Sequence, residues 1–426
     1  MLRIWRQLLG LDDRTVLEDV ELDDDAGIVV AHVRPKSRWR RRCGRCGRRS
    51  PAYDHGEGRR RWRGLDLGTV KVLLEADAPR VSCRDHGVTV AAVPWARHGA
   101  RHTRAFEDTA AWLVTQCSKT AVTNLLRIGW RTVGSIIGRV MAEIDAQVDR
   151  LDGLTRIGID EVSYKKGQNY LTVVVDHDTG RLVWVGIGRD RDTIHRFFDD
   201  LGDARSAQIT HISADGAEAI ATVARLRAPQ AVLCADPFHV VSWATQCLDD
   251  VPRQVWNQAR RAGDMVAWGS HSGLRYNLSR GDARKIQHSR WALWKAGDDL
   301  TDHQRAKLDW IAKTWPTLHR AYLLKEGLRF VFAIKGEPGK QALDRWLAWA
   351  QRSRIPVFVA LGQKIKRHLP AIHAALDHGL SNGLIESTNT KIRLLTRIAF
   401  GFKNPHALIA LAMLSLGGYR PSLPGR

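Results

Sequence analysis

The chain of 426 residues is 44% hydrophobic, so it has ample length for a sizeable core and several domains and is too apolar for a disordered chain. Its 66 Lys and Arg outnumber 45 Asp and Glu, which gives a formal net charge of +21. This excess favours a polyanionic partner over a membrane surface, because neutralising phosphates releases counterions. We find no long apolar run and no signal-peptide pattern, and therefore expect a cytoplasmic, nucleoid-associated protein.

Residues 1–100 are expected to form a zinc-ribbon DNA-binding domain. Residues 27–33, GIVVAHV, have the character of a strand, and the segment 34–63 is dense in arginine. Two pairs of soft ligands follow, each separated by two residues: Cys43 with Cys46, and Cys83 with His86. Each pair can chelate from one tight turn, as a tetrahedral zinc ion requires, so we predict one structural Zn²⁺.

The sequence leaves alternatives open around this zinc site. His55 or Asp85 could replace His86 as the fourth ligand, and the second pair could belong to an ordinary strand turn. An arginine run of this density is often a disordered tail, but here it brackets the first cysteine pair. We therefore predict that Arg41 and Arg42 bind DNA.

Residues 101–150 are expected to form a second DNA-binding domain. The apolar spacing over 104–148 is helical, and 120–141 has the pattern of a helix, a short turn and a second helix capped by Thr132. This layout predicts a helix-turn-helix with Arg131 and Arg139 exposed to DNA, although any two packed helices would look similar. The residues expected to face inward are Val133, Ile136, Ile137 and Val140.

Residues 151–248 carry strand patterns. Three apolar stretches, at 156–167, 169–180 and 181–190, are joined by hairpin-type turns, and two further strands end at Asp215 and Asp236 with helices between them. This succession predicts a mixed sheet covered by helices, in the strand order of a ribonuclease H-like α/β catalytic domain.

A large all-α insertion is predicted at 249–365, after which the helices of 366–426 return to the catalytic domain, so the whole is a multidomain α+β protein. Tryptophans at helical spacing are more often core residues than stacking platforms. Arg284, Lys285, Arg290 and Lys295 surround two indoles and could suit a phosphate backbone. The tryptophans of this segment are Trp256, Trp268, Trp291, Trp294, Trp310, Trp315, Trp346 and Trp349.

Three acids are candidates for a divalent-metal site. Asp160 and Asp236 each end a predicted strand, and carboxylates at the ends of neighbouring strands meet at one sheet edge. Glu386 begins a helix in the stretch GLIESTNTKIRLLTRIAFGF. Alone it would merely complement the helix dipole, but with the two aspartates it completes an oxygen site for two Mg²⁺ or Mn²⁺ ions. The three charges would otherwise repel one another, so activity should depend on metal.

Supporting roles are predicted for residues around these acids. Asp215 should lie nearby, whereas strand alternation turns Glu161 to the opposite face. A hydrogen bond near the site is expected of His239 rather than general-base work. Asn389 shares a helical stripe with Glu386 and is expected to face the DNA strand. The basic positions of the same helix that should bind DNA are Lys391, Arg393 and Arg397.

The chain resembles transposases of the ISL-three insertion-sequence family over nearly its full length. The resemblance rests on the cysteine knuckle with HGVTVAAVPWA, on the helix-turn-helix, and on IGIDEVSYKKG, ISADG, ADPFHVV and the glutamate-bearing helix. It implies a DDE recombinase in which Asp160, Asp236 and Glu386 form the metal-binding triad and Arg393 contacts DNA beside the active site. It also implies binding to the terminal inverted repeats of the element, cleavage and strand transfer into target DNA, and a homodimer or higher oligomer on DNA.

Two other functions are compatible with the pattern. One is a zinc and helix-turn-helix DNA-binding regulator whose ribonuclease H-like domain is inactive, and the other is a structure-selective nuclease without joining activity. The presence of all three acids favours the enzyme, because a decayed copy commonly loses one.

Overall fold

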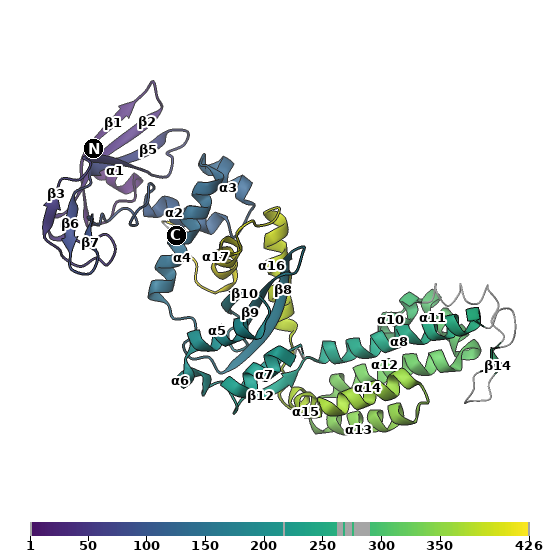
Figure 1. Cartoon of the computed structure of the whole chain (residues 1–426). Coiled ribbons are helices and arrows are strands. Elements are labelled where there is room, and N and C mark those ends of the chain that lie inside the picture. Colours follow the sequence, from purple (N-terminus) through teal and green to yellow (C-terminus); the bar gives the residue numbers. More distant parts are fainter. Residues whose placement is uncertain (1, 216–217, 262–266, 269–274, 277–289, 425–426) are drawn as a thin grey trace.

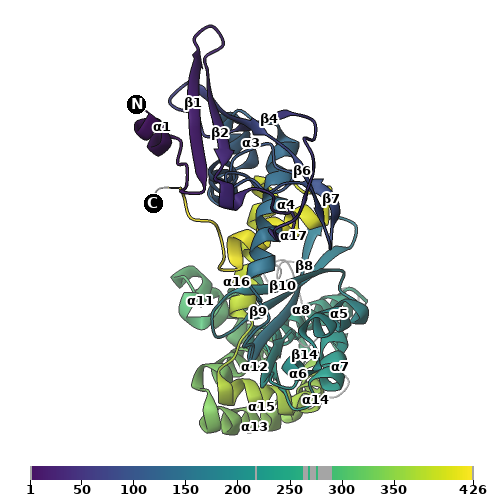
Figure 2. The same cartoon turned by 90° about the vertical axis from the view of Figure 1, so that its left-hand side faces the viewer.

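The structure is a computed structural model that describes residues 2–215, 218–261, 267–268, 275–276 and 290–424. Side chains are described outside 252–290. The chain forms an elongated molecule in which an N-terminal β region, a three-helix segment, a mixed sheet and a helical bundle follow one another (Figures 1 and 2). Within the described residues, no helix combines the length and apolar character needed to cross a membrane.

The N-terminal region contains two small sheets. The predicted strand at 27–33 is confirmed as part of β2, which lies in a four-stranded sheet of order β1-β2-β5-β4. A three-stranded sheet of order β3-β6-β7 carries the cysteine knuckles. A core of its own, including Trp62, Leu74 and Trp95, supports this region. The elements are α1 (Leu2–Leu8), β1 (Thr15–Asp23), β2 (Ile28–Pro35), β3 (Ala52–Asp54), β4 (Arg59–Arg63), β5 (Lys71–Asp77), β6 (Arg80–Cys83) and β7 (Gly87–Val90).

Three helices follow: α2 (Arg104–Leu113), α3 (Lys119–Leu126) and α4 (Trp130–Gln147). The predicted helix, turn and helix are present as α3 and α4, and all four residues expected to face inward are buried. The predicted cap is wrong, because α4 begins one turn earlier, with Gly129 at its N-cap instead of Thr132. Arg127, in the left-handed region at φ 52°, ends α3.

A five-stranded sheet of order β10-β9-β8-β11-β12 forms the centre of the molecule. Strands β8, β9 and β10 are antiparallel neighbours, whereas β11 pairs in parallel with both β8 and β12. The predicted mixed sheet is therefore confirmed. Its strands are β8 (Arg156–Lys165), β9 (Asn169–Asp176), β10 (Leu182–Ile187), β11 (His211–Ala214) and β12 (Val232–Ala235).

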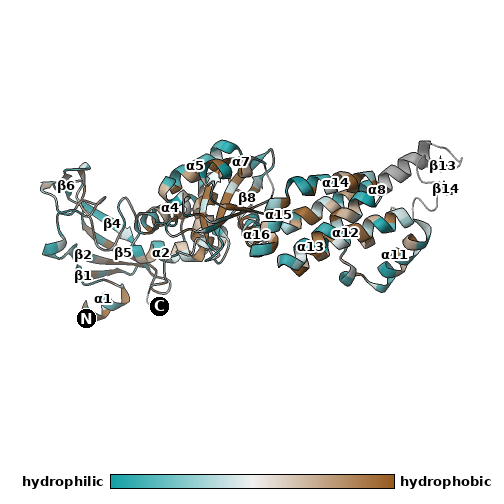
Figure 3. Cartoon of the chain, turned by 90° about the horizontal axis from the view of Figure 1, so that it is seen from below, coloured by the Kyte–Doolittle hydropathy of each residue, from teal (hydrophilic) through white to brown (hydrophobic). Residues whose placement is uncertain are grey.

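Helices cover both faces of this sheet (Figures 1 and 3). Side chains alternate along a strand, so Ile157 and Ile159 join the core under α5 and α7, while Val162 joins a core shared with α2, α4, α16 and α17. The three-helix segment thus shares a core with the sheet, and the expected domain boundary at residue 150 does not separate two cores. The covering helices are α5 (Arg191–Leu201), α6 (Asp203–Ser206), α7 (Glu218–Arg227), α16 (Gly383–Ile398) and α17 (Pro405–Leu416).

A helical bundle extends from the end of the sheet. Its first helix, α8 (Pro237–Arg261), starts directly after Asp236, so the expected boundary at 249 falls inside a helix. The expectation of an all-α segment was wrong in one detail, since the two-residue strands β13 (Ala267–Trp268) and β14 (Arg275–Tyr276) pair with each other. The remaining helices are α10 (Arg290–Trp294), α11 (Asp302–Thr314), α12 (Pro316–Ile334), α13 (Gly336–Arg352), α14 (Pro356–Arg367) and α15 (Leu369–His378).

The bundle tryptophans divide between core and surface. Trp315 and Trp346 are buried, which confirms the expected core role for these two, whereas Trp291 is 67% exposed. Arg284 and Lys285, expected beside two indoles, lie outside the described residues, and so do the side chains of Trp256, Trp268 and Arg290.

Candidate functional site

Asp160 lies within β8, not at its end as the sequence predicted. The strand continues to Lys165, because the β8–β9 hairpin is longer than the parallel part of the sheet. The parallel partner β11 stops pairing at Ile159, opposite Ala214. Asp160 is therefore the first residue of β8 beyond its pairing with β11. Although it lies inside its own strand, it is placed at the edge of the sheet where β11 and β12 end.

Asp236 directly follows β12 and precedes α8. It is only 2% exposed. One carboxylate oxygen accepts a hydrogen bond from the His239 backbone N–H at 3.0 Å, and the other accepts one from the Asn382 backbone N–H at 3.2 Å. Both donors hold the carboxylate in one orientation, and one of them comes from the segment that leads into α16.

Helix α16 and Asn382, the residue before it, contact both aspartates, and the helix carries the third acid. Glu386 lies in its first turn, and the Asn389 Nδ2 donates to Asp160 Oδ2 at 2.8 Å. Asn389 is 2% exposed, so the expectation that it faces DNA is wrong: the helix turns it inward, toward β8. Asn382 was not predicted, because its only sequence signal is an asparagine just before a helix.

The acids act on one another electrostatically. Burial raises the pKa of Asp160 to about 6, and the negative charges of Asp215 and Glu386 add to this shift. The hydrogen bond from the Glu161 N–H acts in the opposite direction and lowers the pKa. Burial and the charge of Asp236 raise the pKa of Glu386 as well. The His239 imidazole opposes both shifts. The raised pKa values of Asp160 and Glu386 show that His239 and, at Glu386, Arg393 offset the burial and the negative charge only in part.

The residues of this site have the oxygen chemistry that a divalent cation prefers. The three acids supply hard oxygen ligands, and the buried side-chain oxygens of Asn382 and Asn389 have no hydrogen-bond partner. A metal-bound water could donate to such oxygens. Among the described residues, the acids are not gathered as tightly as the cysteine and histidine ligands of the N-terminal region.

Glu161 and Asp215 flank the site. Alternation turns Glu161 away from Asp160, toward the face covered by α5 and α7. Burial and then the charge of Asp215 raise the pKa of Glu161 to about 7, partly offset by Arg189. Asp215 also acts on Asp160, so it lies close to the site as the sequence predicted.

The predicted zinc ligands converge in the β3-β6-β7 module. Cys43, Cys46, Cys83 and His86 place one ligand atom each within 4.8 Å of all the others. The Sγ atoms of Cys46 and Cys83 are 3.8 Å apart, and the His86 Nδ1 is 3.6 Å from Cys83 Sγ and 3.8 Å from Cys43 Sγ. Zinc–sulfur bonds of about 2.3 Å give a tetrahedral edge of about 3.8 Å, so the residues fit a closed zinc site. Asp85 instead forms an ion pair with Arg48.

The two arginines beside the first knuckle differ in exposure. Arg41 is exposed and adopts a left-handed φ of 56°. Arg42 is partly buried, donates to the Gly47 carbonyl at 3.1 Å and lies 4.8 Å from the ring centre of Trp39. Arg42 therefore stabilises the loop of Cys43 and Cys46, whereas Arg41 is more accessible to DNA.

An ion-pair network joins the N-terminal region to the three helices. Arg97, with a side chain 9% exposed, contacts Glu107, Asp108 and Glu143. Arg139 pairs with the fully buried Glu107 at 2.5 Å, so its predicted exposure is wrong: its guanidinium compensates a buried carboxylate. Arg131 is exposed as expected.

A cavity of about 740 Å³ lies at this junction and is rich in arginine. Cations from the knuckle, from β4 and from α2 and α4 line it together with Trp39 and Trp62. The arginines are Arg14, Arg42, Arg45, Arg60, Arg97, Arg104 and Arg139. Arg97, Arg104 and Arg139 are already paired with carboxylates, which leaves the arginines of the knuckle and of β4 as the less neutralised part of the lining.

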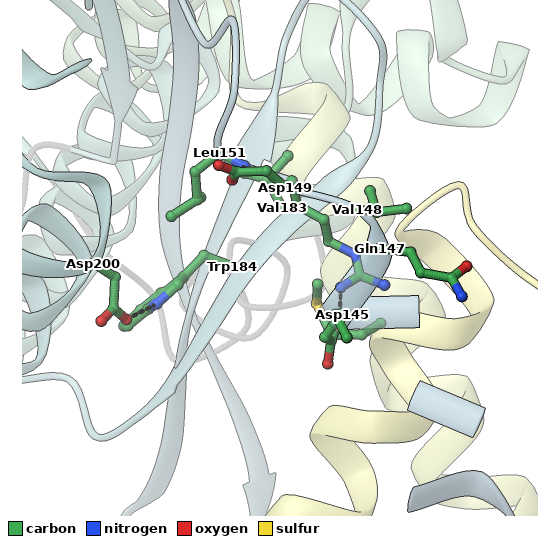
Figure 4. A pocket seen from close by; sticks show the side chains of 11 residues that line it. Asp145, Gln147, Val148, Asp149, Leu151, Val183, Trp184 and Asp200 are labelled. Atoms are coloured by element: carbon green, nitrogen blue, oxygen red, sulfur yellow. Dashed lines mark hydrogen bonds and ion pairs between the residues drawn. The ribbon is translucent and has the colours of Figure 1, made fainter. Parts of the chain in front are cut away.

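A second hollow, between α4 and β10, is lined by acidic residues (Figure 4). Asp145, Asp149 and Asp200 border that hollow, where Arg150 pairs with Asp145 and the Trp184 Nε1 donates to Asp200 at 2.8 Å. Two of these acids are paired, Asp145 with Arg150 and Asp149 with Arg205.

His102 makes the junction sensitive to acid. It is 9% exposed, and its ring centre lies 4.7 Å from that of Phe106, on which it stacks. Burial lowers the pKa of His102 to about 4, and the positive charges of Arg139 and Arg63 act in the same direction. An unfolded histidine titrates near 6.5, so the stability from neutral His102 is full above that pH and is lost as pH falls toward 4. We expect the unfolding free energy of His102→Phe to fall less steeply than that of wild type as the pH is lowered from 6.5 to 4. Urea titrations at several pH values measure this dependence. An unchanged slope would contradict this assignment.

Family models match three parts of the chain. Residues 157–412 match a model described as transposase, 91–140 match the helix-turn-helix domain of transposase family ISL3, and 39–86 match the zinc-finger of transposase IS204/IS1001/IS1096/IS1165.

Named transposases are similar to this chain over all or most of its length. In two strains of Mycobacterium tuberculosis, the transposase for insertion sequence element IS1557 is 62% identical over 434 residues, which span 100% of this chain and 97% of the relative. The transposase for insertion sequence element IS1001 of Bordetella parapertussis is 27% identical over 394 residues, or 91% of this chain and 92% of the relative.

Proposed function

The chain belongs to transposase family ISL3, and on that premise we propose that it binds the terminal inverted repeats of an insertion sequence and catalyses metal-dependent cleavage and strand transfer. The observation that carries this proposal is the placement of α16. The helix presents Glu386, and contacts from Asn389 and the Asn382 backbone reach Asp160 and Asp236. These contacts support a single acidic site built from residues far apart in sequence.

The sheet supports a ribonuclease H-like catalytic domain. Three antiparallel strands followed by two parallel ones, in the order β10-β9-β8-β11-β12, agree with the order expected from the sequence. We propose that the five-stranded sheet with α16 and α17 forms this domain, and that the helical bundle that begins with α8 is an insertion within it. The zinc module and the three-helix segment that packs on the sheet would then be the DNA-binding parts.

Asp160, Asp236 and Glu386 would hold two Mg²⁺ or Mn²⁺ ions. Two such ions about 4 Å apart supply activation of the attacking oxygen and stabilisation of the leaving one. The chain's own residues orient this site: Asn389 fixes Asp160, while the Asn382 and His239 N–H groups fix Asp236. His239 is half-exposed and can hydrogen-bond to DNA at the mouth of the site.

DNA would be bound by cations on both sides of the acids. We assign element-end recognition to the zinc module and to α4, with Arg41 and Arg131 exposed toward DNA. Lys391, Arg393 and Arg397 are exposed on α16 and would contact phosphates near the cleaved bond. A homodimer or higher oligomer would hold two ends together.

Incubation with labelled element-end DNA, Mg²⁺ or Mn²⁺ and a supercoiled plasmid tests this function. We expect cleavage at the element end and joined products in the plasmid. Cleavage without joining would support a structure-selective nuclease. Specific binding without cleavage would support a regulator with an inactive domain, and either result would contradict the proposal.

Asn389 should position Asp160 for metal binding. A hydrogen bond to a charged carboxylate contributes about 1.5–3 kcal/mol, so Asn389→Ala should raise the Mg²⁺ concentration for half-maximal cleavage about ten- to a hundredfold. The metal-induced rise in melting temperature should shrink in parallel. Thr388→Ala removes a buried hydroxyl from the same helix and is the matched control. Equal metal dependence of Asn389→Ala and wild type would rule the role out.

A further inference from the structure

Phe400 has a conformation and an exposure that folding does not explain. It follows the last residues of α16 with φ 54°, in the left-handed region, and its side chain is 91% exposed. The position after a helix cap that adopts this conformation usually holds glycine, because a β-carbon strains it. A ring this exposed gains no burial to offset the strain. Stability alone would therefore favour glycine here, so the aromatic ring is better explained by an interaction.

The surroundings of Phe400 favour a polyanion. From residue 387 to the end of the sequence there is no Asp or Glu. The exposed cations around the ring and along α16 make no ion pair within 4 Å with any described residue. A second copy of a chain with net charge +21 would bring like charge to this surface. The cations are Lys391, Arg393, Arg397 and Lys403.

Phe400 follows α16, whose first turn carries the proposed catalytic acid. Glu386, Arg393 and Arg397 are separated by seven and four residues and lie along one stripe of the helix, which ends at Ile398. Twelve residues at about 1.5 Å each separate Glu386 from Ile398 by about 18 Å, and Phe400 lies two residues further along the chain. At about 3.4 Å per base pair, this corresponds to about six base pairs of duplex.

The end of α16 adjoins the helix-turn-helix. A groove of about 500 Å³ has Ile398 and Phe402 on one side and Trp130 and Arg131 of α4 on the other. Figures 1 and 2 show α17 packed between α4 and α16. Ala399 and Phe402, the neighbours of Phe400 along the chain, line this groove, so DNA bound at the first turn of α4 would lie beside the end of α16.

We propose that Phe400 inserts between two base pairs of the bound element-end duplex, about six base pairs from the cleaved phosphate, and unstacks that step. An apolar wedge of this kind bends DNA and lets it follow a longer protein surface, here the cationic stripe of α16. The proposal rests on the proposed function, since it assumes that α4 and the acids engage one duplex.

The test uses element-end duplexes with 2-aminopurine placed in turn at each of the base pairs near the cleaved phosphate. The full chain, zinc-loaded and carrying Glu386→Gln to prevent cleavage, should raise the fluorescence several-fold at one step about six base pairs away. Phe400→Gly should lose this rise yet fold at least as stably, because glycine suits the conformation. Phe400→Trp should retain it. Leu226→Ala, which removes an exposed apolar side chain on α7, is the matched control.

A flat fluorescence profile, or the same profile with Phe400→Gly, would overturn the wedge. A change in self-association by Phe400→Gly, with the fluorescence unaltered, would assign the ring to protein contacts instead. The readout requires binding and no cleavage. Failure of wild type to cleave would therefore contradict the proposed function alone, while failure of the fluorescence test would leave cleavage intact.

Discussion

Asp236→Asn should lower metal-dependent cleavage of element-end DNA by at least about a thousandfold, since losing a ligand of the metal pair removes several kcal/mol of transition-state stabilisation. Asp236 is nearly buried and its oxygens accept from the Asn382 and His239 N–H groups. The amide keeps the size of the side chain but loses the charge. Cleavage rates are measured on labelled duplexes at saturating DNA and metal.

Asp176→Asn is the matched control for this experiment. Asp176 is also a buried aspartate of the sheet, 7% exposed, but it supports the β9–β10 turn through bonds from Asp178 N–H and the Thr179 hydroxyl. It should keep cleavage near the wild-type rate even if stability falls. Equal cleavage rates of Asp236→Asn and wild type would show that Asp236 is not part of the active site.

Cys46→Ser should abolish the preference for element ends while sparing metal-dependent cleavage of nonspecific DNA. A structural zinc site contributes about 10–16 kcal/mol of binding energy to the fold around it, so its loss unfolds the β3-β6-β7 module. The sheet domain has separate cores and should persist. The affinity of a DNA-binding protein for its specific site commonly exceeds its affinity for nonspecific DNA by at least about a thousandfold. Most of this ratio should be lost in Cys46→Ser.

Two measurements check the zinc prediction. Metal analysis should find one zinc per wild-type chain and less in Cys46→Ser, whereas Cys117→Ser, a partly buried cysteine outside the knuckles, should keep its zinc. Competition binding at fixed salt then compares end and nonspecific DNA. Specific binding that survives loss of zinc would show that the module is not needed for recognition.

Local patterns predicted much of this structure. Two ligands separated by two residues define a tight turn wherever it occurs, so Cys43 and Cys46 could be paired from sequence. The apolar period of residues 133–140 identified the inward face of α4, because burial follows helical geometry. Strands joined by short turns pair with each other, which made the β8–β9–β10 meander predictable.

Contacts across long sequence separations were not predictable. Neither the buried Arg139–Glu107 pair nor the Asn389–Asp160 hydrogen bond has a local signal, because each depends on how separate helices and strands pack. Asp160 was misplaced at a strand end because sequence does not reveal how far a hairpin extends beyond its parallel neighbour. Asn389 was assigned to DNA because helical spacing alone gives a stripe but not the side it faces.

Iron-directed protein cleavage can show whether Asp160, Asp236 and Glu386 bind the same metal ions. Fe²⁺ replaces Mg²⁺ in the zinc-loaded protein, and ascorbate with peroxide then cuts the backbone beside the bound ion. We predict cuts near residues 160, 236 and 386 that Mg²⁺ competes away together and that Glu386→Gln weakens at all three places. Cuts absent from these places, or lost at one without the others, would contradict a shared site.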